Sequence, residues 1–129
     1  MSKSTILLVE DEAGLRIMMH KMIQALGYRA FAAANGPEAL QIWQDRPGQI
    51  DLLLTDMVME GMSGVQLAQK LRSQVPKLKV VYTSGFSVDF LGEDCEPLIE
   101  GENFVQKPYC RQTLASTIRY ALESTDSFE

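Results

Sequence analysis

The sequence predicts an α/β fold in three layers, with helices on both faces of a five-stranded parallel sheet. Short apolar runs at residues 5–9, 52–54 and 79–83 show no alternation of polar and apolar side chains. Such runs are typical of strands that are buried on both faces. Helical patterns separate the runs, and strands that alternate with helices form parallel sheets through right-handed crossovers. We therefore expect a single α/β/α domain.

The first part of the chain predicts three strands with two helices between them. The strands are expected at residues 5–9, 28–33 and 52–56, and the second is weaker because it is rich in alanine. The first helix ends at Gly27 and carries an apolar stripe made of Leu15, Met18, Met19, Met22, Ile23 and Leu26. The second helix begins at Pro37, which suits a first turn, and buries Ala39, Leu40 and Trp43.

The second part of the chain predicts three more helices and two strands. Ser63 and Gln66 form a capping box that opens one helix, and residues 79–83 and 103–106 are expected strands. Glycine and proline interrupt residues 86–101, so we expect only a short, irregular helix there. A last helix carries a stripe made of Leu114, Ile118, Ala121 and Leu122. The domain is expected to span residues 1–125, followed by a short tail at 126–129.

Length, composition and charge limit the classes of protein to which the chain can belong. The chain has 129 residues, enough for one domain, and a net charge of -5 makes nucleic acid an unexpected direct partner. Membrane insertion is not expected, because apolar stretches fall short of the roughly 18 residues of a span. The N-terminal residues lead directly into a strand pattern, without the pattern of a signal peptide. Cys95 and Cys110 have neither disulfide-framework nor zinc-ligand spacing, and we expect free thiols in a cytoplasmic protein.

Polar side chains follow the predicted strands at their carboxyl ends. Glu10 and Asp11 follow the first strand, Asp56 ends the third, and Lys107 follows the fifth. The fourth strand contributes a hydroxyl from either Thr83 or Ser84, which completes the group. Because the carboxyl ends of parallel strands share one edge of the sheet, where ligands bind, these side chains should converge.

This combination suits phosphoryl transfer to a carboxylate. Three carboxylates in one cleft repel one another unless a cation lies among them, and hard oxygen ligands with room for water suit Mg²⁺. The metal and Lys107 would neutralise phosphoryl oxygens, while Asp56 would act as the nucleophile. A helix or loop cap is the plainer interpretation of Asp56, and it leaves the other three strand ends unexplained.

The same residues resemble the receiver domain of two-component response regulators. The matching segments, taken in order, are Val9-Glu10-Asp11-Glu12, Leu54-Thr55-Asp56-Met57-Val58-Met59, Gly64, Thr83-Ser84-Gly85 and Lys107-Pro108. No one of these segments is specific, but together they occur at the right strand ends and in the right order. The resemblance runs from about residue 5 to residue 122 and implies a flavodoxin-like, doubly wound fold. The segments around residues 82–86 and 104–108 look most like receivers attached to hybrid sensor histidine kinases.

The resemblance also implies a role for each site residue. Asp56 would accept a phosphoryl group from a phosphohistidine, and Mg²⁺ (or Mn²⁺) would be held by Glu10, Asp11, Asp56 and the backbone carbonyl of Val58. Ser84 matches the switch hydroxyl, with Thr83 as its rival, and Lys107 matches the lysine that binds the phosphoryl group. Phe104 matches the switch aromatic, and a cis peptide bond would precede Pro108.

Partners follow from the same resemblance. A histidine kinase or a phosphotransfer domain would supply the phosphoryl group, and a homodimer through the last strand and last helix is possible. The chain would not be a conventional enzyme by itself, although it could form part of a hybrid sensor histidine kinase. His20 lies inside the first helix; a phosphotransfer histidine belongs to a helical bundle, so His20 is expected to face solvent.

The sequence departs from the family pattern at several positions. Glu10 stands where aspartate is commoner, so its reach toward the water shell of the metal is longer. Glu60-Gly61 replaces the usual proline and predicts a more flexible loop behind Asp56. Val58 and Phe86 lie two residues past the acceptor and the switch hydroxyl. We hypothesise that these two apolar side chains shield the acyl phosphate from water and lengthen its lifetime.

Three other functions fit these residues less well than that of a phosphoryl-accepting receiver. A haloacid-dehalogenase-like phosphatase also uses an aspartate and Mg²⁺, but it needs a second acid where Val58 stands. A flavodoxin-type cofactor binder would need a Ser/Thr/Gly-rich phosphate loop after the first strand, where residues 10–12 are all acidic. A pseudo-receiver that acts only as an interaction module ranks last, because all the acceptor chemistry is present.

Overall fold

A five-stranded parallel sheet forms the centre of the molecule, as the sequence predicts. The computed structural model describes residues 3–85 and 97–123. The strands are β1 (Thr5–Val9), β2 (Arg29–Ala33), β3 (Leu52–Asp56), β4 (Lys79–Ser84) and β5 (Phe104–Gln106). Their order is β2-β1-β3-β4-β5, and every pairing is parallel. This order is that of a flavodoxin-like, doubly wound fold, with a crossover beside β1 that the periodicity of the sequence could not supply.

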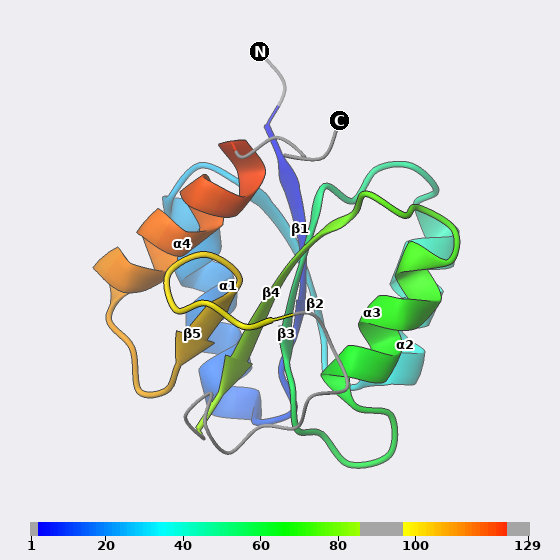
Figure 1. Ribbon diagram of the computed structural model, residues 1–129, viewed down its shortest axis with the longest axis horizontal. Coiled ribbons are helices and arrows are strands. Elements are labelled where there is room, and N and C mark those ends of the chain that lie inside the picture. The colour runs from blue at the N-terminus through cyan, green and yellow to red at the C-terminus, as the bar shows by residue number, and fades with distance from the viewer. Residues whose placement is uncertain (1–2, 86–96, 124–129) are drawn as a thin grey trace.

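Within the described parts of the chain, two pairs of helices cover the two faces of the sheet. The helices are α1 (Ala13–Ala25), α2 (Gly36–Asp45), α3 (Gly64–Arg72) and α4 (Arg111–Glu123). In Figure 1, α1 and α4 lie on one side of the sheet and α2 and α3 on the other. The buried side chains divide in the same way, so one core lies under each pair. This division places the carboxyl ends of the strands at one edge, between the two helical layers.

Side-chain caps begin α2 and α3, and α2 begins at Gly36, one residue before the predicted Pro37. Asn35 accepts a hydrogen bond from the backbone N–H of Glu38 and caps α2, whose first turn contains Pro37. Ser63 and Gln66 exchange side-chain and backbone hydrogen bonds at the start of α3, which is the predicted capping box. These caps fix where each chain segment leaves the sheet edge and turns back.

Some local predictions differ from the structure. The second and fifth strands begin one residue later than predicted, at Arg29 and Phe104, and the fourth extends to Ser84. Met18 is 53% exposed, because it lies outside the arc of α1 that faces the sheet. Most of the irregular helix predicted at residues 86–101 lies outside the described residues, and residues 97–101 are not helical.

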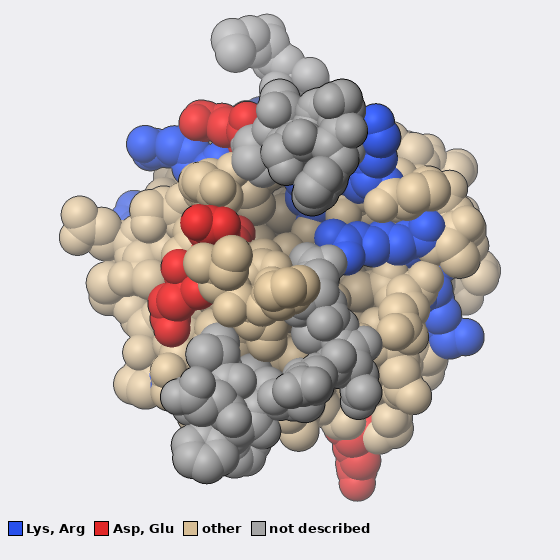
Figure 2. Space-filling model, viewed as in Figure 1, with Lys and Arg blue, Asp and Glu red and all other residues tan. Residues whose placement is uncertain are grey.

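The surface of the described residues is mixed in charge. On the face drawn in Figure 2, Lys, Arg, Asp and Glu side chains are interspersed with uncharged residues, and at the upper left acidic and basic side chains lie next to each other. Within residues 3–85 and 97–123, no helix is both long enough and apolar enough to cross a membrane.

Candidate functional site

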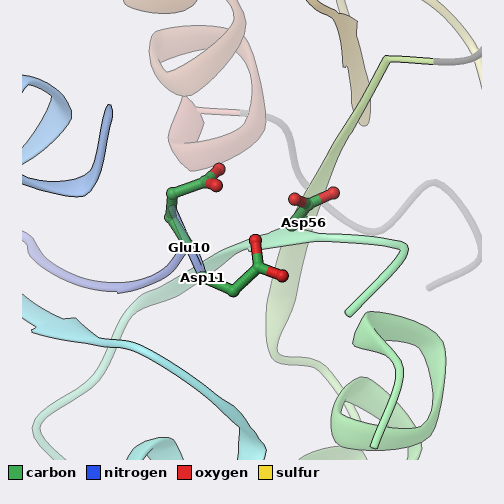
Figure 3. A group of neighbouring side chains, drawn as sticks. All are labelled: Glu10, Asp11 and Asp56. Carbon is green, nitrogen blue, oxygen red and sulfur yellow. The ribbon is translucent and has the colours of Figure 1, made fainter. Parts of the chain in front are cut away.

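Three carboxylates meet at the carboxyl edge of the sheet. Glu10 and Asp11 directly follow β1, and Asp56 ends β3, the parallel neighbour of β1. One oxygen from each carboxylate lies within 4.8 Å of the other two, and Figure 3 shows the three groups around a common space. Glu10 is 1% exposed and Asp56 is 7% exposed, whereas Asp11 lies at the surface. So much negative charge in a half-buried site favours the binding of a cation.

Lys107 links two of these acids. Its Nζ donates to Oε1 of Glu10 at 2.8 Å and to Oδ2 of Asp56 at 3.0 Å. The lysine follows β5, the edge strand, and its side chain crosses over the end of β4 to reach β1 and β3. The ammonium group therefore bridges an acid from each of two strands, and it is 21% exposed.

Burial and hydrogen bonding set the protonation of these groups. Burial raises the pKa of Glu10, and the hydrogen bonds from Lys107 and from the N–H of Glu12 oppose this shift only in part. Burial acts to lower the pKa of Lys107, but hydrogen bonds to Glu10 and Asp56 outweigh it, so this pKa is raised. Lys107 consequently keeps its positive charge throughout the neutral pH range.

Residues 10–12, here called the acid turn, are held by hydrogen bonds. The N–H of Glu10 donates to the carbonyl of Ala33 at 3.1 Å, and the N–H of Glu12 donates to Oε2 of Glu10 at 3.1 Å. The Glu12 side chain caps α1 by accepting from the N–H of Leu15 at 2.7 Å. Nη1 of Arg16 donates to the carbonyl of Glu10 at 2.9 Å. Arg16 was not identified from the sequence. Its position, a basic residue in the first turn of the helix that follows the acids, could have indicated this contact.

Val58 lies beside Asp56 on the predicted metal-ligand loop. Its N–H donates to Oδ1 of Asp56 at a long 3.4 Å, and its side chain is 55% exposed. An apolar side chain at the mouth of the site agrees with a shielding role, which stays a hypothesis. Phe86, the second residue of that hypothesis, lies outside the described residues.

Two hydroxyl side chains end β4 next to the acids. Thr83 pairs in register with Asp56, and Ser84 follows it; both side chains are 1% exposed. The carbonyl of Ser84 accepts from the N–H of Lys107 at 2.7 Å, so these two residues are tied together through the backbone. The choice of Ser84 over Thr83 as the switch hydroxyl stays a prediction.

Phe104 and Pro108 flank Lys107. Phe104 is completely buried, pairs in register with Tyr82 and contributes to the core beneath α2 and α3. Its role as a switch aromatic stays a prediction. The Lys107–Pro108 peptide bond is cis, as the resemblance implied.

The histidine and cysteine predictions have different outcomes. The prediction that His20 faces solvent is wrong: its ring is half-buried, and Nε2 lies 3.0 Å from the carbonyl oxygen of Ala30. The reason is that α1 packs beside β2, which a helical stripe does not reveal. Cys110 is an exposed free thiol, as predicted, and its hydrogen bond with Thr113 lowers its pKa. Cys95 lies outside the described residues.

Comparison with known protein families gives a match over most of the chain. The family described as "Response regulator receiver domain" matches residues 6–119. This segment runs from the second residue of β1 through most of α4, and hence contains all the site residues described above. The match therefore covers the site and the fold that carries it.

Individual relatives point the same way. The chain is 35% identical to the sensor kinase CckA of Brucella abortus over 95% of its own length, but it covers only 13% of that kinase. A solved receiver domain from the hybrid histidine kinase CckA superposes with a TM-score of 0.77 at 34% identity, covering 93% of this chain and 100% of that one. The response regulator receiver protein CpdR of Brucella abortus is 32% identical, covering 91% of this chain and 95% of CpdR.

A further similar structure is that of a complex. The response regulator TrrA of Thermotoga maritima, solved in complex with Mg²⁺ and BeF, is 32% identical to this chain. The superposition has a TM-score of 0.60 and covers 65% of this chain and 71% of TrrA.

Proposed function

This chain belongs to the response regulator receiver domain family, and we propose that Asp56 is the residue on which it accepts a phosphoryl group. The donor would be the phosphohistidine of a histidine kinase or of a phosphotransfer domain. The observation that carries the proposal is the Lys107 ammonium, which bridges Glu10 and Asp56 beside the exposed Asp11. A nucleophilic carboxylate, further acids and a fixed cation are the parts that phosphoryl transfer to aspartate requires.

The donor set at this edge fits a hard divalent cation. Carboxylate oxygens within 4.8 Å of one another, one of them on an exposed residue, suit Mg²⁺, which keeps several of its waters. Glu10, Asp11, Asp56 and the carbonyl of Val58 would hold the ion, with Glu10 acting through a water. Mn²⁺ would fit the same ligands. When bound, the ion would neutralise charge on the phosphoryl oxygens.

Residues of the chain supply the rest of the reaction. A carboxylate oxygen of Asp56 bonds to phosphorus as the phosphorus–nitrogen bond of the donor breaks, and the imidazole keeps the electron pair and takes a proton from solvent. Lys107 already contacts Asp56, so its N–H groups can donate hydrogen bonds to the phosphoryl oxygens during the transfer and stabilise their negative charge. The hydroxyl of Ser84 donates a further hydrogen bond to the bound phosphoryl group.

Signalling would follow from the position of Ser84 and Phe104. The backbone of Ser84 is bonded to Lys107, and Phe104 is buried beside β4, so a shift of Ser84 toward phosphate would disturb β5. The surface of β5 and α4 would then display the phosphorylated state to a partner. A homodimer through this surface is one form that the output could take.

The chain covers a small part of the CckA kinase and nearly all of CpdR. A receiver of this kind can therefore be one domain of a hybrid histidine kinase or a stand-alone regulator. In either setting we place it in the cytoplasm, where histidine kinases present their phosphohistidine. Activity beyond self-catalysed phosphorylation and dephosphorylation would belong to other domains.

The test is the intact mass of the protein after incubation with acetyl phosphate and Mg²⁺. Wild type should gain one labile phosphoryl group, and a chelator should abolish the gain. Asp56→Asn should gain none. If wild type gains none under the same conditions, the chain is a pseudo-receiver that acts as an interaction module. Ser84→Ala and Thr83→Ala, compared by lifetime of the phosphoryl group, decide which hydroxyl contacts it.

A further inference from the structure

Three helices that begin at the carboxyl edge carry a glycine in their first two residues. These are Gly14 in α1, Gly36 in α2 and Gly64 in α3. A Cβ added at Gly14 would lie 3.4 Å from a carboxylate oxygen of Glu12, and one at Gly36 would lie 2.7 Å from Sδ of Met62. A Cβ at Gly64 would lie 2.1 Å from the backbone oxygen of Asp56. The Cβ at Gly36 would also lie 2.9 Å from Cβ of Met62, but only at Gly64 is the contact with backbone atoms.

The first turn of α3 therefore lies directly on the peptide group of Asp56. The same added Cβ would be 3.0 Å from the carbonyl carbon of Asp56 and 3.1 Å from Cα of Met57. The N–H of Gly64 also donates to the carbonyl of Met57 at 3.0 Å. Gly64 is not among the glycines with positive φ, so the position requires space and not an unusual backbone conformation.

A second contact holds the carbonyl of Asp56. Oγ1 of Thr55 donates to this carbonyl oxygen at 3.0 Å, and the Thr55 side chain is completely buried. The peptide that follows the acceptor carboxylate is thus fixed by a helix terminus and by a buried hydroxyl. Neither Thr55 nor Gly64 contacts the reacting atoms.

We propose that Gly64 is a positioning residue for phosphorylation, because its lack of a side chain lets α3 fix the peptide of Asp56, which the Thr55 hydroxyl also holds. A methyl at Gly64 would lie more than 1 Å inside the ordinary contact distance of about 3.5 Å, so the helix and the peptide must separate. The carboxylate would then move relative to Lys107, and a displacement of about 1 Å can slow a reaction roughly 100-fold. This inference rests on the function proposed above.

The test compares the same substitution at all three glycines. Initial rates of phosphorylation by acetyl phosphate with Mg²⁺ are measured by intact mass and divided by the folded fraction from circular dichroism. Gly64→Ala should be roughly 10- to 100-fold slower than wild type. Gly14→Ala should stay near the wild-type rate, and Gly36→Ala, whose added methyl meets Met62 and not the Asp56 peptide, should slow the reaction far less than Gly64→Ala and controls for lost stability at a helix start. Equal rates for Gly64→Ala and wild type would overturn the inference.

Thr55 provides a second test if Gly64→Ala does not fold. Thr55→Val removes the hydroxyl with little change in shape and should slow phosphorylation per folded molecule, whereas Thr55→Ser keeps the donor and should restore the rate. A Thr55→Val variant that reacts as fast as wild type would contradict the inference. If wild type itself takes no phosphoryl group, the proposed function fails and this inference fails with it.

Discussion

The acid turn and the loop that follows Asp56 lie at the same edge of the sheet but are held in place by different interactions. The acid turn, residues 10–12, joins β1 to α1 directly and is held by hydrogen bonds from Arg16 and from its own backbone. Residues 57–63, here called the acceptor loop, are longer and pack apolar side chains into the core: Met57 and Met59 are each 7% exposed, and the backbone of Met57 is also hydrogen-bonded to Thr83 and Gly64. Metal ligands are expected in both regions, yet hydrogen bonds fix the acid turn, whereas the acceptor loop combines backbone hydrogen bonds at its two ends with apolar packing between them.

This difference shows how one edge can be both ordered and adaptable. Hydrogen bonds set the acid turn in one arrangement, because each is lost if the turn shifts. Methionine side chains in the acceptor loop tolerate small rearrangements, because they are unbranched and flexible. Gly61 adopts a φ of +80°, so this glycine provides a left-handed turn within the loop. The greater flexibility that we predicted from Glu60-Gly61 stays a prediction.

Lys107 joins the two regions, and its loss should have the largest effect. Lys107→Met removes the cation between Glu10 and Asp56 and should slow phosphorylation by acetyl phosphate roughly 100-fold, as for a lost transition-state donor. Mass spectrometry over time measures this rate, with Lys77→Met as a control for the loss of one positive charge. A rate within about twofold of the wild-type rate would exclude a direct role of Lys107 in the reaction.

The raised pKa of Lys107 adds a prediction about alkaline stability. Its folded pKa lies above the reference value of 10.5, so the ion pairs stabilise the fold fully below that pH. This contribution is lost as the pH rises through the higher folded pKa. Urea unfolding from pH 9 to 11.5 should show a steeper fall in stability for wild type than for Lys107→Met. If the free energy of unfolding falls equally with pH in both proteins, the ion pairs of Lys107 do not stabilise the fold.

Packing in the acceptor loop should matter next. Met59→Ala removes a buried side chain from the core beneath α2 and α3, and should lower the free energy of unfolding by about 2 kcal/mol. Urea denaturation measures this loss, and Val75→Ala, at a 40% exposed position, serves as the control. If both substitutions lower the free energy of unfolding by the same amount, the burial of Met59 does not stabilise this loop.

Hydrogen bonding in the acid turn should have a smaller effect on stability. Arg16→Met removes the donor to the carbonyl of Glu10 and should cost about 1 kcal/mol of folding free energy. It should also weaken Mg²⁺ binding, because the turn that carries Glu10 and Asp11 loses a constraint. Calorimetric titration with MgCl₂ checks this, with Arg29→Met, at the exposed start of β2, as the control. Unchanged Mg²⁺ affinity would show that Arg16 does not order the turn.

The smallest effect is expected at the mouth of the site. Val58→Asn replaces an exposed apolar side chain beside Asp56 and should speed hydrolysis of the acyl phosphate by a few fold. The decay of the phosphorylated mass after removal of acetyl phosphate measures the lifetime. An unchanged lifetime in Val58→Asn, and in the double variant with Phe86→Asn, would remove the shielding hypothesis.

Strand ends explain why most of the site was predictable. Asp56 and Lys107 each follow a short apolar run, and a parallel sheet brings such positions to one edge whatever the order of the strands. The capping box at Ser63 was predictable for a similar reason, because both partners are local in sequence.

Contacts between elements distant in sequence could not be predicted. Nothing local indicates that Oε1 of Glu10 meets Lys107, because that contact depends on the order β1-β3-β4-β5. The contact of Gly64 with the peptide of Asp56 depends on the path of the acceptor loop, and the contact of His20 with Ala30 depends on how α1 lies against β2. Periodicity specifies which face of an element is buried, but not what it meets.

The most direct test of the central claim is to locate the phosphoryl group among the three carboxylates. Borohydride reduces an acyl phosphate to an alcohol, which converts phosphorylated aspartate to homoserine, and tandem mass spectrometry of the digested protein identifies the position. We predict homoserine at position 56 alone, formed only with acetyl phosphate and Mg²⁺ present. Reduction at Glu10 or Asp11, with Asp56 intact, would contradict the account.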